Sequence, residues 1–428
     1  MSRNHGILIV IVPTDKSKLR LLLLLIIFSQ LMFVFPASKT TFLYMQNADA
    51  QQQQDMESDS CVRYDSTENE IRINCESANL TDIYNQLQDP DLLHKETTDG
   101  VWLLNAGIVI EEGATLYINS TDTSWLKIAA DGETAHAILV LGALKIDSVK
   151  ISSWDTDAND YLKFKFDILP SREYEKSGID AIPRPYILVE EEATGTTDIT
   201  NSELAYLGYA CGGGCSGLTY YGGDGSIIKG NEIHHNRFGF YSKAVGELIL
   251  EDNHVHHNYM YGFDPHSGSH DMTIKNNTVH DHGAMGIICS QDCYNVTIED
   301  NEVYKSAGSG IMFSRNMFDS IARNNNVHDE DKCIFVSQSS NNKVYQNNVA
   351  NCETGIDVFH NAAENTIYNN TIINSKTGLG IEEAGSGNKI YSNAIIDTTE
   401  NPVNIEDSDL EEETMLKDNK IINARLQQ

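Results

Sequence analysis

The sequence has few basic residues and few prolines. Lys and Arg total 30 against 62 Asp and Glu, which gives a formal net charge of −32. This deficit argues against general binding to nucleic acids or anionic membranes, because both need a basic surface. Only 8 prolines accompany 30 glycines, and 40% of the residues are hydrophobic, so the composition is not that of a disordered chain. The 428 residues are enough for two or three ordinary domains or one large repetitive domain.

A long hydrophobic run lies near the N-terminus and is short for a membrane span. It extends from Leu21 to about Phe35, after the basic residues of 16–20, and small residues follow at 37–38 and 48–50. These features predict a signal peptide, with a membrane anchor as the alternative. We therefore expect residues 1–50 to be a signal peptide or membrane anchor with a linker. The protein is expected to be exported, to the periplasm, the extracellular space or the cell surface.

Eight cysteines, an even number in an exported chain, indicate disulfides. Eight cysteines allow 105 connectivities, and the sequence does not choose among them. Proximity along the chain suggests four pairs, Cys61–Cys75, Cys211–Cys215, Cys289–Cys293 and Cys333–Cys352. Metal ligation by the Cys-x3-Cys pairs is the alternative, but export and the lack of histidine at ligand spacing beside them favour disulfides.

The pattern of the chain changes near residue 100. Residues 51–100 are polar and acidic, with one short helix expected near Thr81–Leu93 and capped by Thr81 or Asp82. We expect this segment to cap the first open edge of the structure that follows. From Val101 onward, short apolar runs separated by Gly, Asn and Asp have no helical period and indicate β-strands.

The second half of the chain repeats every 22–24 residues. An Asn/Asp-Asn-x-Val/Ile element recurs, and a Gly-apolar element follows each copy after about seven residues. The first element ends at Ile233, Val255, Val279, Val303, Val327, Val349, Ile372 and Ile395. Two β elements per repeat predict a solenoid, whereas a leucine-rich repeat would need a leucine–asparagine frame and a propeller a longer period. The expected fold is all-β, a right-handed parallel β-helix over residues 101–425 with a short N-terminal capping segment.

The hexapeptide Tyr261–His266 breaks the repeat with a phenol, a carboxyl group and an imidazole, and with a proline in a strand. Side chains of a strand alternate between its two faces. Counting from the Gly of each second element, Phe263 and Pro265 should point inward, while Asp264 and His266 should point outward. Ionisable groups clustered on one groove are what acid–base chemistry needs, so we expect the active site here.

Stacking of the coils adds neighbours to this site. Parallel coils lie about 4.8 Å apart, which should place Tyr241 beside Asp264 and Lys243 beside His266. Tyr261 should lean outward at the entrance of the same strand. The expected site is therefore one surface cluster drawn from two coils.

Other histidines are concentrated around the hexapeptide, at His234, His235, His254, His256, His257, His270, His280 and His282. Most of them follow the asparagine element, where solvated turn residues are expected. A transition-metal site is the alternative, because histidine is the commonest protein ligand of such ions. We assign no metal ligand among them.

The hexapeptide, placed on one coil of a β-helix, resembles the signature of mannuronan C5-epimerases. The similarity includes residues 204–209 and 239–241 before it and residues 286–288 and 309–311 after it. Members of that family convert β-D-mannuronate to α-L-guluronate within the polymer alginate, without cutting the chain. The resemblance implies an isomerase that acts on a uronate-containing polysaccharide.

C5-epimerisation needs neutralisation of the C6 carboxylate, a base that removes H5, and an acid that returns a proton from the opposite face. By the resemblance, His266 would be the base, Tyr261 a proton donor or its partner, and Asp264 a group that orients His266 or contacts the sugar. Lys243 is a candidate for neutralising the carboxylate from the stacking argument alone. Substrate contacts are expected from Lys243, Tyr241, His282, Arg315 and Gln291.

The resemblance is incomplete beside the motif. Relatives in the periplasmic alginate-export branch typically carry Asp-Arg, a basic residue and Arg where this chain has Ser267-Gly268, Met285 and Gln291. A chain of net charge −32 repels a polyuronate unless the groove is locally basic or a cation such as Ca²⁺ bridges. Apart from Ca²⁺, we expect no cofactor, and we expect no binding to nucleic acid; the sequence identifies no partner protein. A polysaccharide lyase and a non-catalytic β-helix that binds carbohydrate or metal are the alternative functions.

Overall fold

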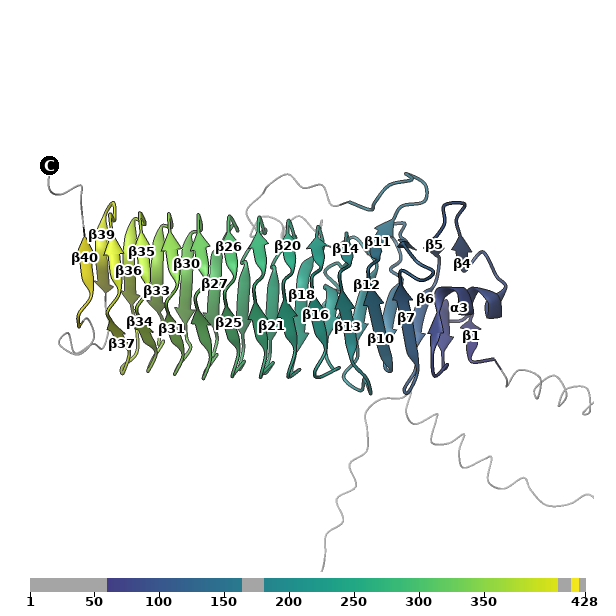
Figure 1. Ribbon diagram of the computed structural model, residues 1–428, viewed down its shortest axis with the longest axis horizontal. Helices are drawn as coiled ribbons and strands as arrows, with labels where there is room; N and C mark the ends of the chain where they lie inside the picture. The colour runs from purple at the N-terminus through teal and green to yellow at the C-terminus, as the bar shows by residue number, and fades with distance from the viewer. Residues whose placement is uncertain (1–59, 164–180, 407–416, 423–428) are drawn as a thin grey trace, which may run out of the picture. The chain divides into compact units, whose positions relative to one another are not determined.

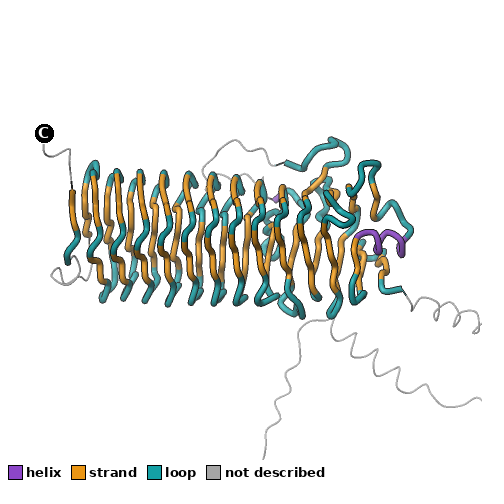
Figure 2. The backbone as a smooth tube through the Cα atoms, viewed as in Figure 1, coloured by secondary structure: helices purple, strands orange, loops and turns teal. Residues whose placement is uncertain are grey.

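The computed structural model describes residues 60–163, 181–406 and 417–422. Over these residues the chain winds into stacked coils that each cross three β-sheets, as Figures 1 and 2 show. Neighbouring coils pair in parallel, so the predicted parallel β-helix is confirmed. The predicted signal peptide or anchor, residues 1–50, lies outside the described residues. Within them, no helix combines the length and the apolar character needed to span a membrane.

The three sheets run the length of the solenoid, with 14, 12 and 14 strands among the described residues. In stacking order, sheet A contains β1 (Val62–Asp65), β2 (Glu70–Ile73), β6 (Gly107–Ile110), β9 (Ala137–Val140), β12 (Tyr186–Val189), β15 (Gly217–Tyr220), β18 (Phe238–Lys243), β21 (Phe263–His266), β24 (Ile287–Ser290), β27 (Ser309–Ser314), β30 (Lys332–Ser337), β33 (Thr354–Phe359), β36 (Thr377–Glu382) and β39 (Asn401–Glu406). Sheet B contains β3 (Ala78–Asn79), β7 (Thr115–Asn119), β10 (Ala143–Asp147), β13 (Thr197–Thr200), β16 (Ile227–Lys229), β19 (Ile249–Glu251), β22 (Thr273–Lys275), β25 (Thr297–Glu299), β28 (Ile321–Arg323), β31 (Lys343–Tyr345), β34 (Thr366–Tyr368) and β37 (Lys389–Tyr391). Sheet C contains β4 (Leu93–Lys95), β5 (Val101–Leu104), β8 (Trp125–Ala129), β11 (Lys150–Trp154), β14 (Glu203–Ala205), β17 (Glu232–His234), β20 (His254–His256), β23 (Thr278–His280), β26 (Glu302–Tyr304), β29 (Asn326–His328), β32 (Asn348–Ala350), β35 (Thr371–Ile373), β38 (Ala394–Ile396) and β40 (Lys420–Ile422).

A short helix, α3 (Leu80–Leu87), lies at the N-terminal end of the stack (Figure 1). Asn79 caps it, because its side chain accepts from the backbone N–H of Asp82 and the Asp82 carboxylate accepts from that of Asn79. The helix was expected over Thr81–Leu93 with a cap at Thr81 or Asp82, and both expectations were wrong in detail. The helix ends before Pro90, which cannot continue a helical hydrogen-bond pattern.

The two polar residues at the start of each asparagine element have different structural roles. Asn301 is buried, and its amide donates to the carbonyl of Ile274 at 2.9 Å and to Oδ1 of Asn325 at 3.0 Å. Asn277 donates in turn to Oδ1 of Asn301 at 2.9 Å, which links coil to coil. The residue before it, Asp300, takes the left-handed conformation with φ of 56°. The element thus combines a corner residue, Asp300, with a buried amide, Asn301.

The inward position predicted for Phe263 is confirmed, and it belongs to a ladder of buried side chains along sheet A. Fully buried side chains follow the first position of each second element, at Phe240, Phe263, Ile287, Ile311, Ile334, Ile356 and Leu379. Glycine precedes six of these residues, and Cys333 precedes Ile334. Close packing between coils explains the glycine. A Cβ at Gly262 would lie 2.5 Å from the carbonyl oxygen of Gly286 and 2.7 Å from Nε2 of His282.

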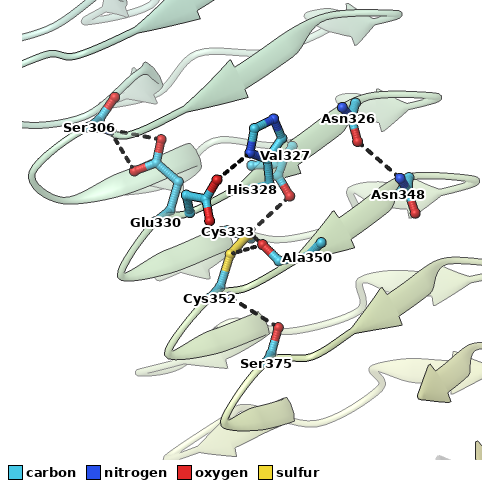
Figure 3. The surroundings of a disulfide bond; sticks show 11 residues. Ser306, Asn326, Val327, His328, Glu330, Cys333, Asn348, Ala350, Cys352 and Ser375 are labelled. Atoms are coloured by element: carbon cyan, nitrogen blue, oxygen red, sulfur yellow. Dashed lines mark hydrogen bonds and ion pairs between the residues drawn. A yellow bond between two sulfur atoms is a disulfide. The ribbon is translucent and has the colours of Figure 1, made fainter. Parts of the chain in front are cut away.

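Three of the four suggested disulfides are present, Cys61–Cys75, Cys211–Cys215 and Cys333–Cys352. Figure 3 shows the last of these among the turns that join sheet C to sheet A. Ser306 and Glu330 occupy the equivalent turns of the two preceding coils, where the Ser306 N–H donates to both carboxylate oxygens of Glu330 at 3.1 and 3.0 Å (Figure 3).

The suggested pair Cys289–Cys293 was wrong, because both are buried free thiols. Cys289 points into the core from β24 and is fully buried. Cys293 follows a tight turn, and its Sγ donates instead to the carbonyl of Ser290 at 3.2 Å. The turn thus gives Cys293 a backbone partner and no disulfide.

Candidate active site

A cleft of about 460 Å³ opens on the outer face of sheet A, over β18 and β21. Six of the eight residues expected at the site line it, namely Tyr241, Lys243, Tyr261, Asp264, His266 and Arg315. The remaining two, His282 and Gln291, do not. The fold therefore brings together side chains from three separate coils.

The register of β18 and β21 is the predicted one. Tyr241 pairs with Asp264, and Lys243 pairs with His266. The Tyr241 and His266 rings lie 5.6 Å apart, centroid to centroid. Pro265 has no N–H to donate, and on its far side β21 pairs with β24 only at the two ends of the strand.

Asp264 forms the floor of the cleft. It points outward as predicted, but it is only 3% exposed, so the expectation of an exposed sheet surface was wrong at this position. Its Oδ1 has no hydrogen-bond partner among the described residues. Burial raises the pKa of Asp264 well above its ordinary value, against the opposing charges of Arg315 and Arg237. The carboxyl group is therefore held toward its neutral, protonated form.

The His266 imidazole is oriented by a serine and a glutamine, whereas the sequence suggested Asp264 for this role. Nδ1 of His266 lies 2.6 Å from Oγ of Ser267, which donates to Oε1 of Gln291 at 3.0 Å. The Ser267 hydroxyl donates its proton to Gln291, so it can only accept from His266. Nδ1 of His266 is therefore the protonated nitrogen, and Nε2 keeps a free lone pair. Burial and then the charge of Arg315 lower the pKa of His266, which favours the neutral ring. Gln291, expected to contact substrate, does not line the cleft and instead accepts the hydrogen bond of Ser267.

His282 was also expected to contact substrate, and the structure contradicts this. It is 3% exposed and points inward in the turn between sheets C and A. Its Nδ1 accepts from the backbone N–H of Asn258 at 3.3 Å, so it occupies a place in the buried turn column that asparagine fills in earlier coils. The inward position removes its side chain from the cleft.

The cleft is locally basic although the chain as a whole is acidic. Arg237, Lys243 and Arg315 line it, against one carboxyl group among the described lining residues, that of Asp264. Sequence reasoning missed Arg237, which precedes β18 and whose guanidinium lies 4.5 Å from the centroid of the Phe238 ring. Arg237 could have been found from the sequence, because it lies just before the Gly-apolar element of β18. The condition that a polyanionic ligand would require, a basic groove, is therefore met.

One wall of the cleft comes from a loop that the repeat pattern did not identify. Gly212, Gly213 and Ser216 line the cleft, and the Cys211–Cys215 disulfide closes the loop. Arg184 is fully buried beneath it and donates to the carbonyls of residues 207 and 208 at 3.1 and 2.9 Å. A cross-link and a buried cation thus hold this wall in place.

Comparison with known proteins finds a matching family and a similar curated protein. Residues 189–381 and 291–420 match the family described as periplasmic copper-binding protein (NosD), and the two matches together span more than half of the chain. A mannuronan C5-epimerase of Pseudomonas fluorescens is 27% identical over 209 residues, which are 46% of this chain and 35% of that protein. The chain thus spans about a third of the length of this curated relative.

Solved structures of the periplasmic alginate epimerase AlgG share the fold. One matches with a TM-score of 0.68 at 20% identity, over 82% of this chain and 85% of that one. A double mutant of AlgG matches with a TM-score of 0.65 at 16% identity, over 91% and 99%. The resemblance to mannuronan C5-epimerases is confirmed by these matches. The chain belongs to the NosD family, and it is similar in sequence and fold to the mannuronan C5-epimerases that its hexapeptide predicted.

Proposed function

We propose that this protein is an exported C5-epimerase that acts on uronate residues within a polysaccharide. The observation that carries the proposal is the combination, in one cleft, of an imidazole whose pKa is lowered, three tyrosines, a carboxyl group whose pKa is raised, and three cations. A uronate polymer needs such a basic groove on a protein of net charge −32. The periplasmic descriptions of the matched family and of AlgG support export.

In the proposed reaction, Nε2 of His266 removes H5 from the sugar. The electron pair of the broken C–H bond moves into the C6 carboxylate and forms an enolate. Arg237, Arg315 and the protonated Asp264 stabilise the negative charge on the two carboxylate oxygens, because preorganised donors act most strongly where charge develops. Tyr261 then donates a proton to C5 from the opposite face, and solvent restores both groups.

Tyr241 and Lys243 have separate proposed tasks. Burial raises the pKa of Tyr241, so its phenol stays protonated and can donate a hydrogen bond to the sugar. Lys243 is exposed at the edge of the cleft and is proposed to bind the carboxylate of a neighbouring uronate. The C4–O glycosidic bond is not broken, which distinguishes this reaction from elimination by a lyase.

The cleft does not fit a transition-metal ion, although the matched family is described as copper-binding. Its lining residues include one imidazole, His266, and one carboxyl group, Asp264, with three cations around them. Imidazole-preferring ions need several such ligands and no surrounding positive charge. The proposed reaction therefore uses the side chains alone.

The test is hydrogen exchange at C5. Polymannuronate incubated with the protein in D₂O should gain deuterium at C5 and a guluronate signal in the NMR spectrum. His266→Gln should abolish both, while His270→Gln, a matched change in the same coil outside the cleft, should leave both unchanged.

Two outcomes would refute the proposal. Absence of exchange on polymannuronate and on other polyuronates would exclude the epimerase. Ultraviolet absorbance from unsaturated sugar ends, with chain shortening, would assign a lyase to the same cleft.

A further inference from the structure

Residues 211–215, which we call the glycine wall, present main chain to the cleft and are closed by a disulfide. Gly212 and Gly213 line the cleft, and both are exposed. A Cβ atom added to either glycine would meet no atom within 4 Å, so both residues face open space. A ligand in the cleft therefore reaches the peptide groups of the wall with no side chain between them.

The other side of the glycine wall lies against the outer face of sheet A. A Cβ atom added to Gly214 would lie 2.7 Å from Cδ2 of Leu188, which is only 8% exposed. Leu188 belongs to the same outward column as Thr219 and Tyr241, because the three residues pair in register on β12, β15 and β18. Thr219 is fully buried. The outward column is therefore covered on the N-terminal side of Tyr241, and the glycine wall bounds the cleft there.

The glycine wall offers hydrogen-bond donors that the protein does not use. The N–H of Tyr209 donates to the carbonyl of Cys215 at 2.7 Å, and the N–H of Cys215 donates to the carbonyl of Gly213 at 2.8 Å. Between these two, the backbone N–H groups of residues 210–214 donate to no protein acceptor among the described residues. Backbone N–H groups are strong donors, and successive ones in a turn can bind an anion. The wall thus suits the oxygen atoms of an acidic sugar.

The disulfide gives the glycine wall its fixed shape. Three consecutive glycines do not keep one conformation by themselves, because glycine has the widest choice of backbone angles. Arg184 holds the base of the loop at residues 207 and 208, and the Cys211–Cys215 bond closes its tip. Cys215 is buried, whereas Cys211 is exposed. The cross-link therefore anchors the exposed end of the wall to a buried residue, and a loop held in its bound conformation loses less entropy on binding.

The glycine wall faces the part of the cleft that contains Lys243. The wall precedes β15, and Tyr221 follows it. Nζ of Lys243 lies 5.6 Å from the centroid of the Tyr221 ring. The wall and Lys243 therefore lie near opposite ends of β15, and the strands of both precede β21, which carries Asp264 and His266. This part of the cleft adjoins the reacting groups and does not include them.

We propose that the glycine wall and Lys243 together bind the uronate next to the one that reacts. Lys243 supplies the charge, and the N–H groups of Gly212 and Gly213 supply hydrogen bonds to the oxygen atoms of this neighbouring sugar. Cys211 and Cys215 are positioning residues, because their bond holds the donors in place. The proposal rests on the proposed function and extends it from the reacting uronate to its neighbour. The wall should therefore contribute to the affinity for the polymer and not to proton transfer at C5.

The experiment compares two disulfides. Calorimetry with hexamannuronate, in the His266→Gln background, measures Kd without turnover. The double change Cys211→Ser and Cys215→Ser should weaken binding by about tenfold, the loss expected for one hydrogen bond to a charged group. With His266 present, it should raise KM and leave kcat within about twofold. The matched control is Cys61→Ser with Cys75→Ser, outside the cleft, which should leave Kd unchanged. The control should lower the Tm more, because its cysteines are 14 residues apart and those of the wall only 4.

Two glycine variants separate contact with the polymer from the folding of the wall. Gly213→Ala adds a methyl group that faces open space, and the φ angle of Gly213 is not in the left-handed region. This variant should keep the Tm and weaken hexamannuronate binding, because the methyl group stands between the wall and the sugar. Gly214→Ala places its methyl group against Leu188 instead, and should both weaken binding and lower the Tm.

Three results would overturn the proposal. They are hexamannuronate that does not bind, an unchanged Kd in the double serine variant or in Gly213→Ala while the circular dichroism stays native, and a loss of kcat at constant KM. Failure of the proposed function gives a different pattern. If the unchanged protein binds hexamannuronate and the wall variants weaken that binding, but no deuterium enters C5, the binding site stands and the epimerase does not.

Discussion

The protonation state of Asp264 can be measured without any substrate, through the pH dependence of stability. Asp264 is buried in the floor of the cleft, and its pKa is raised by that burial. In the unfolded chain the same group ionises near its ordinary value, about 3.9. Above that pH the folded protein keeps a proton that the unfolded chain has lost. Its contribution to stability is therefore complete below about pH 3.9 and is lost as the pH rises toward the folded-state pKa.

The Asp264→Asn variant removes this titration while it keeps the size and shape of the side chain. Each pH unit between the unfolded and folded pKa values lowers the unfolding free energy of the unchanged protein by about 1.4 kcal/mol relative to the variant. The stabilisation by D264N should therefore be small near pH 4 and should grow with that slope toward neutral pH. Equilibrium unfolding in urea, with disulfides intact, at a series of pH values measures it.

Asp357 provides a matched control in the same outward column of sheet A. It is 2% exposed, like Asp264, but its carboxylate forms an ion pair with Lys332. Asp357→Asn removes that partner and should lower the unfolding free energy by about 1–3 kcal/mol at neutral pH. If D264N instead destabilises the protein as D357N does, or differs from the unchanged protein by an amount independent of pH, Asp264 is ionised and the proposed role of its proton is wrong.

Three further changes have defined outcomes. The charge of Arg315 lowers the pKa of His266, whose neutral form is the active one. Arg315→Gln should therefore raise that pKa and shift the acidic limb of the kcat/KM profile to higher pH. An unmoved limb would contradict this assignment. Ser267→Ala should lower kcat by about 2- to 13-fold with little change in KM, because it removes a hydrogen bond worth about 0.5–1.5 kcal/mol that holds the reactive tautomer of His266. An effect confined to KM would place Ser267 in substrate binding. Asn301→Ala should lower the free energy of unfolding, measured in urea, by about 2–4 kcal/mol, because two donated hydrogen bonds are lost and their acceptors remain buried. A loss below about 1 kcal/mol would show that the coils relax around the change.

The register of the site could be predicted from the sequence because two periodicities combine, the alternation along each strand and the repeat from coil to coil. Alternation along a strand decides which face a side chain takes, and the 22–24-residue repeat decides which side chains become neighbours on adjacent coils. The pairings of Tyr241 with Asp264 and of Lys243 with His266 follow from these periods alone and are present in the structure. Gln291 lies one residue beyond the alternating strand, in a left-handed turn, so alternation does not decide its direction, and its contact with substrate stays a prediction.

The depth of the cleft and the loop that walls it could not be predicted from these two periodicities. Alternation places Asp264 on the outer face but does not show that neighbouring side chains cover it. The loop that closes the cleft, residues 208–216, lies between repeats, and its position depends on contacts with Arg184 from more than 20 residues earlier in the chain. His282 was misassigned because it sits in a turn, where no alternation rule separates inward from outward positions.

Departures from a repeat are informative in a solenoid because each column of equivalent residues experiences nearly the same packing. The asparagine, glycine and apolar columns keep their residue type over many coils, since the neighbours above and below impose it. A side chain that differs from its column gains nothing from that packing, so a cluster of such differences needs another physical reason. Two clusters occur within residues 254–266, the imidazoles on sheet C and the hexapeptide on sheet A, joined by one short turn. One stretch of chain therefore carries both departures, and the regular coils around it hold the geometry of the cleft in register.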